Sequence, residues 1–373
     1  MQHCDAIVIG AGIAGATLSA HLAADRAVTL VEAEEVAGYH TTGRSAAIWY
    51  LNYGPPDVRA LTELSGPFFR APPAGFADAP LMHQRGTMFV APADQLDQFA
   101  ELLAGSVAVE ELTEAQARAL VPALRPGYTK RALIERDAFD MDVAALHQGF
   151  LRQLKSRGGR LALRARAGRI ERRGGVWHVA CADGSVHAAP LLVNAAGAWG
   201  DEVARLAGVI PLGLVPKRRT GVIIDPAPWQ VADWPMVHDA ANSFYARPEA
   251  RTRLMVSPVD ETPMEPQDVQ PDELDVALAV HNMQQALDIE VRRVERSWAG
   301  LRTFTPDGSL AFGWDADMPG FFWFVGQGGY GIQTSPAAGA FAADLIAGRD
   351  PGPAASIIAA VSPARFRVGI QAA

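Results

Sequence analysis

Three glycines near the start of the chain have the spacing of a phosphate-binding turn. Gly10, Gly12 and Gly15 form the motif G-x-G-x-x-G directly after the apolar run at residues 6–9. The first glycine permits a tight turn, the second lets a pyrophosphate approach the backbone, and the third lets a helix pack close to the strand. Free N–H groups at the start of that helix attract phosphate oxygens. The turn therefore predicts a dinucleotide site.

One carboxylate narrows the choice of nucleotide. Glu32 ends the second predicted strand, AVTLVE at residues 27–32, and follows Gly12 by twenty residues. A carboxylate at this distance accepts hydrogen bonds from ribose hydroxyls, and it disfavours a 2′-phosphate because like charges would meet. The motif therefore indicates FAD or NAD rather than NADP.

Two segments, PKRRTGVII and WAGLRTF, contain arginines that can bind a carboxylate, because a guanidinium can hold both of its oxygens. Strand alternation in PKRRTGVII sends Arg218 and Arg219 to opposite faces. Arg302 lies in the apolar run WAGLRTF, where a buried cation needs an anion, either the substrate or an internal partner such as Asp307. Tyr245 can add a hydroxyl to the same carboxylate, or it can simply pack.

The sequence predicts both helices and strands as the elements that position these residues. The sequence predicts a strand–turn–helix unit at the start, and a strand, a second glycine loop at residues 326–331 and a helix near the end. Between them, the pattern indicates helices at 61–69, 113–121, 142–157, 202–207 and 271–288, and strands at 87–90, 161–172, 176–183 and 185–197. Residues 215–260 alternate like antiparallel strands.

The fold class that follows is α/β with α+β character. We expect a Rossmann-like domain assembled from separated segments, residues 1–82, 140–212 and 300–373. An antiparallel, β-rich substrate-binding domain, residues 83–139 and 213–299, is inserted between them.

Composition excludes several classes of partner. The chain has 373 residues, is 49% hydrophobic and carries a net charge of −8, which argues against nucleic acid and anionic membrane surfaces as partners. The basic run at 155–173 alternates with apolar residues, as on a solvated sheet face. Cys4 and Cys181 are the only cysteines, too few for a disulfide framework or a metal cluster, and no metal site is expected. No apolar run reaches the ~18 residues of a transmembrane helix, so we expect a cytoplasmic monomer.

Five motifs then resemble one family over nearly the whole chain. VIGAGIAGA, GRSAA, VNAAGAW, WAGLR and GQGGYGIQTSPAAG are similar to segments of the FAD-dependent D-amino-acid oxidase/sarcosine oxidase/glycine oxidase superfamily. Within it, GYHTTGRSAA, PPAGF, ALHQG and QGGYGIQTS most resemble the bacterial D-arginine dehydrogenases. The resemblance implies FAD rather than NAD. Covalent attachment of the sarcosine-oxidase type needs a cysteine in the C-terminal half, and none follows Cys181, so we expect non-covalent FAD.

The resemblance also implies where the cofactor lies. The second glycine loop would place N–H groups near the flavin pyrimidine ring, where they stabilise negative charge. The predicted cofactor residues are Gly10, Gly12, Ile13, Ala14, Gly15, Glu32, Ala33, Thr42, Gly43, Arg44, Ser45, Ala46, Ala196, Gly197, Gly328, Gly329, Tyr330, Gly331, Ile332 and Gln333.

The implied reaction is amino-acid oxidation, in which a hydride passes from Cα to flavin N5 and water hydrolyses the resulting iminium. Arg219, Tyr245 and Arg302 would bind the substrate carboxylate. Tyr53 would reach the substrate from a lid at residues 50–54, and the carbonyl of Gly329 would accept from the amine. No general base is assigned.

The predicted side-chain pocket departs from the D-arginine dehydrogenases. Those enzymes have a glutamate at the position of Thr87 and a histidine at that of Ile48, and Tyr50 is bulkier than its counterpart. An uncharged pocket cannot compensate for the desolvation of a guanidinium. Neutral D-amino acids, aliphatic or aromatic, are therefore the expected substrates. His238 lines this pocket in the family pattern, whereas a lone histidine is more often structural.

Three other functions are alternatives to the oxidation of neutral D-amino acids. N-alkyl or cyclic amino acids are the nearby alternative, as in sarcosine oxidases. A non-catalytic flavoprotein subunit is disfavoured by the retained Arg219, Tyr245 and Arg302, and an NAD-dependent dehydrogenase is disfavoured by the second glycine loop. The sequence leaves the electron acceptor open between a quinone and oxygen. Of the three lysines, only Lys217 could approach the flavin in the way that oxygen-reactive members require, so a dehydrogenase is favoured.

Overall fold

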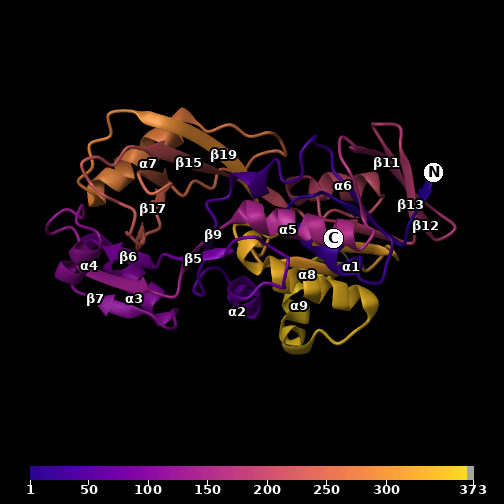
Figure 1. The fold of residues 1–373 in the computed structure, drawn as a ribbon, viewed down its shortest axis with the longest axis horizontal. Coiled ribbons are helices and arrows are strands. Elements are labelled where there is room, and N and C mark those ends of the chain that lie inside the picture. The colour runs from indigo at the N-terminus through magenta and orange to yellow at the C-terminus, as the bar shows by residue number, and fades with distance from the viewer. Residues whose placement is uncertain (368–373) are drawn as a thin grey trace.

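The computed structural model describes residues 1–367, and its centre is a six-stranded sheet (Figure 1). The strand order is β10-β3-β2-β14-β21-β20, with β20 antiparallel to β21 and the other pairs parallel. All residues of β2, β3, β14 and β21 are buried, as expected for parallel strands covered on both faces. The strands are β2 (Ala6–Ile9), β3 (Val28–Val31), β10 (Arg160–Ala162), β14 (Leu191–Asn194), β20 (Ala311–Trp314) and β21 (Phe321–Val325).

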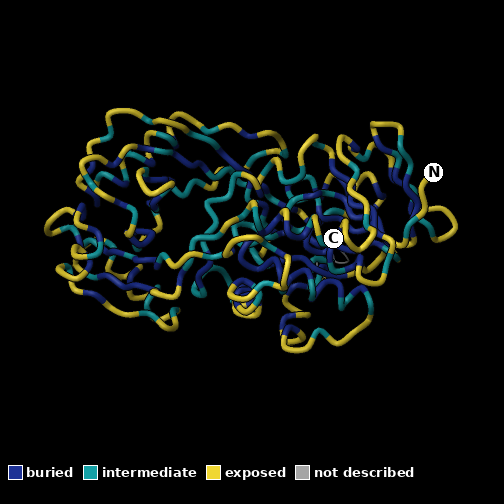
Figure 2. Tube along the Cα trace, in the orientation of Figure 1, coloured by how far each residue is buried: buried dark blue, intermediate teal, exposed yellow. Residues whose placement is uncertain are grey.

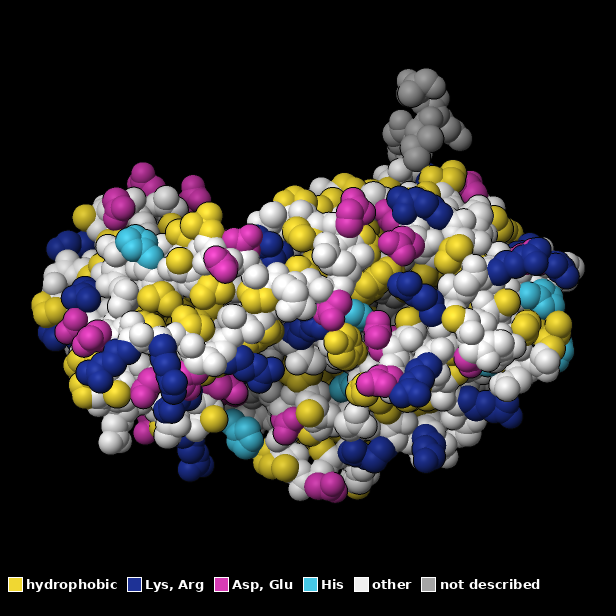
Figure 3. All heavy atoms as spheres, turned by 90° about the horizontal axis from the view of Figure 1, so that it is seen from above, with side chains coloured by type: hydrophobic (Ala, Val, Ile, Leu, Met, Phe, Trp, Pro, Cys, Tyr) yellow, Lys and Arg dark blue, Asp and Glu magenta, His cyan; other side chains and the backbone are white. Residues whose placement is uncertain are grey.

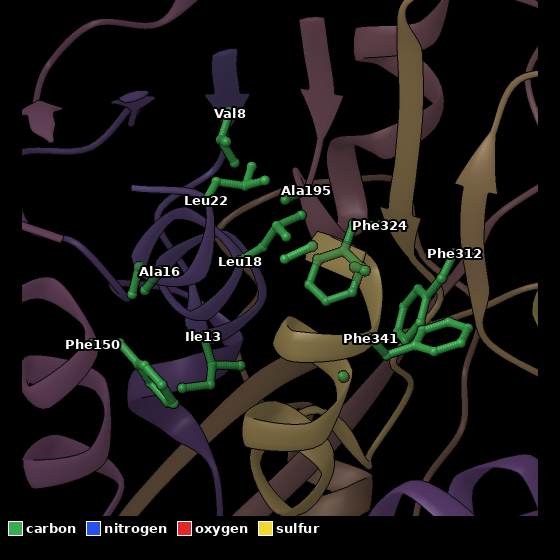
Figure 4. Packing of buried hydrophobic residues seen from close by; sticks show 14 of the residues in the cluster. Val8, Ile13, Ala16, Leu18, Leu22, Phe150, Ala195, Phe312, Phe324 and Phe341 are labelled. Carbon is green, nitrogen blue, oxygen red and sulfur yellow. The ribbon is translucent and has the colours of Figure 1, made fainter. Parts of the chain in front are cut away.

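Three helices cover one face of this sheet. Helices α1 (Ile13–Leu22), α5 (Val143–Ser156) and α8 (Gly331–Ala347) pack side by side, and α2 (Pro56–Arg70) packs against α8. Figure 4 shows Leu18 of α1 beside Phe324 of β21, and Phe341 of α8 beside Phe312 of β20, in the apolar layer between helices and sheet. This packing fixes the N-termini of α1 and α8, and a glycine-rich turn leads into each of them.

The opposite face carries smaller elements. A four-stranded sheet, in the order β1-β13-β12-β11, and helix α6 (Gly200–Leu206) pack there. Its strands are β1 (Gln2–His3), β11 (Ala167–Arg173), β12 (Val176–Cys181) and β13 (Val186–Ala189). Figure 2 shows the strands between these layers as largely buried and the outer loops as exposed.

A second, eight-stranded sheet occupies the other half of the molecule, in the order β19-β15-β18-β17-β16-β6-β8-β7 (Figure 1). Its strands are β6 (Thr87–Ala91), β7 (Glu110–Leu112), β8 (Arg131–Glu135), β15 (Val215–Ile224), β16 (Met236–Asp239), β17 (Tyr245–Glu249), β18 (Arg253–Ser257) and β19 (Val294–Phe304). Helices α3 (Leu96–Ala104), α4 (Glu114–Leu120) and α7 (Glu273–Ala286) flank it. The division into the two predicted domains stays a prediction, and β19 crosses its boundary at residue 300.

Three expectations about strands are corrected. The strands within 215–260 pair antiparallel with one another, as predicted, but β16 pairs in parallel with β6, so the sheet of the predicted inserted domain is not wholly antiparallel. The predicted strand at 185–197 is two strands, because Pro190 has no N–H for a ladder and separates β13 from β14, which join different sheets. The run at 161–172 likewise divides between β10 and β11, which also join different sheets.

A short three-stranded sheet connects the two halves near the predicted lid. Its order is β4 (Ile48–Trp49), β9 (Phe139–Met141) and β5 (Met82–Gln84), all antiparallel. In the described chain, none of the helices has the length and apolar composition needed to cross a bilayer. Figure 3 shows acidic and basic side chains interspersed on one face of the molecule rather than gathered into a patch of one sign.

Candidate active site

The first glycine turn has no room for side chains. A Cβ added to Gly15 would lie 1.8 Å from the carbonyl oxygen of Gly10, and one added to Gly10, where φ is +101°, would lie 2.5 Å from that of Ala195. Helix α1 starts here, and the N–H of Ile13 donates to Thr42 Oγ1 at 2.9 Å. The turn therefore keeps the strand end open and aims a helix N-terminus at whatever binds beside it.

One continuous cavity runs along this turn. Glu32 lies in it, and its two carboxylate oxygens accept the N–H groups of Ala11 at 2.7 Å and Glu34 at 2.9 Å, which fixes the acid at the end of β3. The predicted cofactor residues that line the cavity are Gly10, Gly12, Ile13, Ala14, Glu32, Ala33, Thr42, Ser45, Ala196, Gly197, Gly328, Gly329, Gly331 and Ile332.

Six predicted cofactor residues lie outside this lining: Gly15, Gly43, Arg44, Ala46, Tyr330 and Gln333. The Arg44 side chain turns away and pairs with Asp268 at 2.5 Å, and it also donates to two carbonyl groups of the second half. The Gln333 amide donates to Thr62 Oγ1 at 2.8 Å. Any contact of Arg44 with a cofactor would therefore be through the backbone, whereas the Gln333 side-chain oxygen Oε1 is buried without a hydrogen-bond partner in the described chain.

The sequence analysis missed several cavity residues. Thr41, Glu34 and His40 line it, with His40 Nε2 3.0 Å from Glu34 Oε1, and the His40 ring lies 4.6 Å from that of Trp199. The motif VNAAGAW contains Trp199, so that signal was available. The other three follow β3 in a segment whose course depends on distant elements.

Arg302 is a buried cation at one end of the cavity. Its Nη1 donates to Tyr53 Oη at 3.0 Å, and no carboxylate of the described residues forms an ion pair with it. Asp307, the internal partner considered from the sequence, pairs with Arg365 at 2.7 Å instead. A Cβ added to Gly329 would lie 2.5 Å from Tyr53 Oη and 3.0 Å from Arg302 Nη1. Only a glycine at 329 leaves space in front of this cation.

Arg219 is a second cation beside it. Burial and the charge of Arg302 lower the pKa of Arg219, whereas neighbouring tyrosines outweigh burial and raise the pKa of Arg302. Glu261 accepts from Arg219 at 3.0 Å and from Lys217 at 2.8 Å, and it is half-exposed. Arg218 points to the other face, as predicted, where it pairs with Asp275 at 2.7 Å. Two close cations with one partly solvated acid form an arrangement suited to binding an anion.

A smaller cavity meets the first one at these cations. Both are lined by Thr41 and Arg302, and the smaller one is also lined by Ala46, Arg219 and Tyr245. The guanidinium of Arg302 therefore lies where the larger cavity meets the smaller one.

The predicted lid closes over this junction. Tyr50 stacks on Tyr53 with ring centroids 5.1 Å apart, and Tyr53 meets Tyr330 edge-on at 4.9 Å. Glu135 holds the lid from β8, since it accepts the N–H of Leu51 at 2.6 Å and the side-chain amide of Asn52 at 2.6 Å. The sequence analysis did not identify Glu135, and burial raises its pKa.

The predicted pocket residues lie near the lid, but none of Ile48, Tyr50, Thr87 and His238 lines either of the two cavities. Thr87 and His238 are buried on neighbouring strands of the eight-stranded sheet, and His238 stacks on Phe89 at 4.5 Å. Burial and the charge of Arg219 lower the pKa of His238 to about 3, so the ring is neutral at physiological pH. Ile48 packs with the apolar cluster that contains Tyr245.

A family model described as DAO, FAD-dependent oxidoreductase, matches residues 5–345. The chain belongs to this DAO family. A curated protein, FAD-dependent oxidoreductase domain-containing protein 1 of Xenopus laevis, is 29% identical over 174 residues, which are 42% of this chain. The match spans about a third, 34%, of that protein's length.

Solved structures share the whole DAO fold. L-proline dehydrogenase from P. horikoshii superposes with a TM-score of 0.83 at 20% identity and covers 99% of both chains. Glycine oxidase from Geobacillus kaustophilus has a TM-score of 0.81 at 20% identity, covering 94% of this chain and 96% of its own. Iminodiacetate oxidase from Chelativorans sp. BNC1 has a TM-score of 0.77 at 19% identity, covering 96% and 98%.

The described residues fit the FAD of this family. The turn at Gly10 and Gly12 and the start of α1 suit the pyrophosphate, and Glu32 suits a ribose. Helix α8 begins at Gly331 in the same cavity, so its positive end faces the region next to Arg302. When bound, FAD supplies an acceptor for two electrons and a hydrogen from the substrate.

Proposed function

We propose that this chain oxidises neutral D-amino acids to 2-oxo acids, with non-covalent FAD as the first electron acceptor. The observation that carries the proposal is Arg302, which has no carboxylate partner in the described chain and lies beside Tyr53 and Gly329 where the two cavities meet. A buried, unpaired guanidinium is a site for the carboxylate of a ligand.

Each residue of the junction has a part in the proposal. Arg302 and Arg219 hold the substrate carboxylate, and the hydroxyls of Tyr53 and Tyr245 donate to it. The Gly329 carbonyl accepts from the amine, which directs Cα toward the larger cavity. The stacked lid keeps water away, so that these charges act in a medium of low dielectric constant.

The neutral side chain follows from the pocket wall. Ile48, Tyr50 and Thr87 carry no charge, and the ring of His238 is neutral. The nearby acid, Glu135, already accepts from the lid backbone and from Asn52. A guanidinium would lose its water there without gaining a free carboxylate. The motifs shared with D-arginine dehydrogenases support the reaction, whereas Thr87 argues against their substrate.

Secondary amines are the second candidate. The names of three structural neighbours, a proline dehydrogenase, a glycine oxidase and an iminodiacetate oxidase, favour N-alkyl or cyclic amino acids as well as primary ones. Product analysis separates the two, because a primary amine gives ammonia and a 2-oxo acid. An N-methyl amino acid gives methylamine and a 2-oxo acid when Cα is oxidised, or formaldehyde and the free amino acid when the methyl carbon is oxidised, and a cyclic amino acid releases no ammonia. Ammonia and a 2-oxo acid from D-leucine or D-phenylalanine would support our proposal, and turnover of only N-alkyl compounds would reject it.

We also propose a monomeric, cytoplasmic dehydrogenase with a quinone as second acceptor. Lys217 lies on the side of β15 that carries Arg219, but its ammonium group pairs with Glu261 at 2.8 Å and lies over the Phe304 ring at 5.0 Å. A lysine engaged in this way is not free to assist oxygen. Reoxidation by a quinone analogue much faster than by air-saturated buffer is the expected result.

A further inference from the structure

Three buried polar atoms in the pocket wall have no hydrogen-bond partner in the described chain: Thr87 Oγ1 and both ring nitrogens of His238. Thr87 is 0% exposed and His238 is 4% exposed. A buried polar group without a hydrogen-bond partner is destabilising, so folded proteins rarely keep several together unless a ligand satisfies them.

The strand register places these atoms in one patch. Strands β6 and β16 run parallel with Thr87 beside Met236 and Phe89 beside His238, so Thr87 and His238 project from the same face of the sheet. The His238 ring lies 5.6 Å from Tyr245 and 6.4 Å from Tyr50, the residues proposed to bind and cover the substrate. A substrate held by Arg302 would therefore extend its side chain toward this patch.

The surroundings of His238 keep it neutral. The nearby charge of Arg219 and the burial of the ring favour the unprotonated form, and the side chain of Asn242, which acts in the opposite direction, falls short of a hydrogen bond to either nitrogen. A neutral imidazole offers one donor and one acceptor, and a threonine hydroxyl offers both. A ligand that satisfies this patch must therefore offer both a hydrogen-bond donor and a hydrogen-bond acceptor.

We propose, resting on the proposed function, that the preferred substrates are D-amino acids whose neutral side chain bears a hydrogen-bonding group, above all a carboxamide. The amide NH₂ donates to the free ring nitrogen or to Thr87 Oγ1, and the amide oxygen accepts from the other residue. An apolar side chain of equal size would leave all three atoms unpaired.

Two isosteric pairs test this. The ratio of kcat/KM for D-asparagine over D-leucine, and for D-glutamine over D-methionine, should exceed about 10 in the FAD-loaded enzyme, since sites built for hydrogen bonds reject analogues that lack them. Thr87→Val combined with His238→Leu should lower each ratio at least about tenfold. Thr129→Val is the matched control, because Thr129 Oγ1 is also buried and unpartnered but lies outside this wall, and it should leave the ratios unchanged.

Two results would overturn the inference. One is a wild-type ratio at or below one that the double variant does not change. The other needs no turnover: Thr87→Val should raise the melting temperature, and a fall would show that the hydroxyl already has a partner. Oxidation of only L- or N-methyl amino acids would reject the proposed function instead, and the ratio of carboxamide to apolar side chains among those compounds would still test the patch.

Discussion

Arg302 is the residue on which the carboxylate site depends. Its Nη1 contacts Tyr53, whereas the acid nearest in sequence, Asp307, is bound by Arg365. Arg302→Met should leave FAD bound and lower kcat/KM at least about a hundredfold, since loss of one partner of a buried charge pair costs about 3–5 kcal/mol. Steady-state kinetics measures the change in kcat/KM, and flavin absorbance checks that FAD is still bound.

A matched control distinguishes the site from the fold. Arg365→Met removes the partner of Asp307 without touching the junction of the cavities, and it should keep nearly normal kcat/KM. If Arg302→Met is as active as this control, Arg302 is structural and the carboxylate binds elsewhere.

Thr87 should select against charged side chains. D-Methionine, D-leucine or D-phenylalanine should exceed D-arginine in kcat/KM by at least roughly tenfold, a difference of about 1.4 kcal/mol, because no free acid lines the wall. Thr87→Glu should restore part of the arginine activity and depress that on apolar side chains. A wild-type preference for D-arginine would mean that Glu135, which lies opposite Thr87 in the β6–β8 pair, binds the guanidinium.

At the level of elements, the lid is held by a carboxylate from another strand. Glu135→Gln would place an NH₂ donor against the N–H of Leu51 or the amide of Asn52, so the lid should open more often. Hydrogen exchange at residues 50–54 should become faster, and kcat/KM should fall about tenfold, since hydrogen bonds to a charged group are worth about 1.5–3 kcal/mol.

Glu110→Gln provides the comparison on the neighbouring strand, where Glu110 is exposed and pairs only with Arg136 at 2.7 Å. This variant should exchange like the wild type at 50–54. Unchanged exchange in Glu135→Gln as well would mean that aromatic stacking alone holds the lid.

The sequence was informative where a local pattern decides the structure. The spacing of Gly10, Gly12 and Gly15 predicted the turn, and the alternation of Arg218 and Arg219 predicted their opposite faces, because both follow from a few consecutive residues. The partners of those residues could not be predicted in the same way. Glu135 and Leu51 are 84 residues apart, and the parallel pairing of β16 with β6 brings together strands that no local pattern connects.

For the whole molecule, buried histidines couple stability to pH. His21 of α1 is buried in the helical layer, and burial with the nearby charge of Arg157 lowers its pKa from 6.5 to about 4. The unfolded chain therefore binds a proton that the folded chain does not, and stability falls as the pH drops from about 6.5 toward 4. One such proton gives a slope of about 1.4 kcal/mol per pH unit at most.

The His21→Leu variant should lose this contribution. Urea unfolding of the FAD-loaded protein from pH 7.5 to 5 should show a smaller loss of unfolding free energy on acidification than in the wild type. Parallel curves for the two proteins would show that His21 can take up its proton without leaving the fold.

The central claim is that this site oxidises neutral D-amino acids at a bound flavin. The most direct measurement is flavin absorbance under anaerobic conditions after addition of matched D-, L- and N-methyl amino acids, which excludes any role of the second acceptor. Our account predicts bleaching by neutral D-amino acids, with little or none by their L-enantiomers, by N-methyl forms or by D-arginine. Bleaching by L- or N-methyl amino acids alone would contradict it.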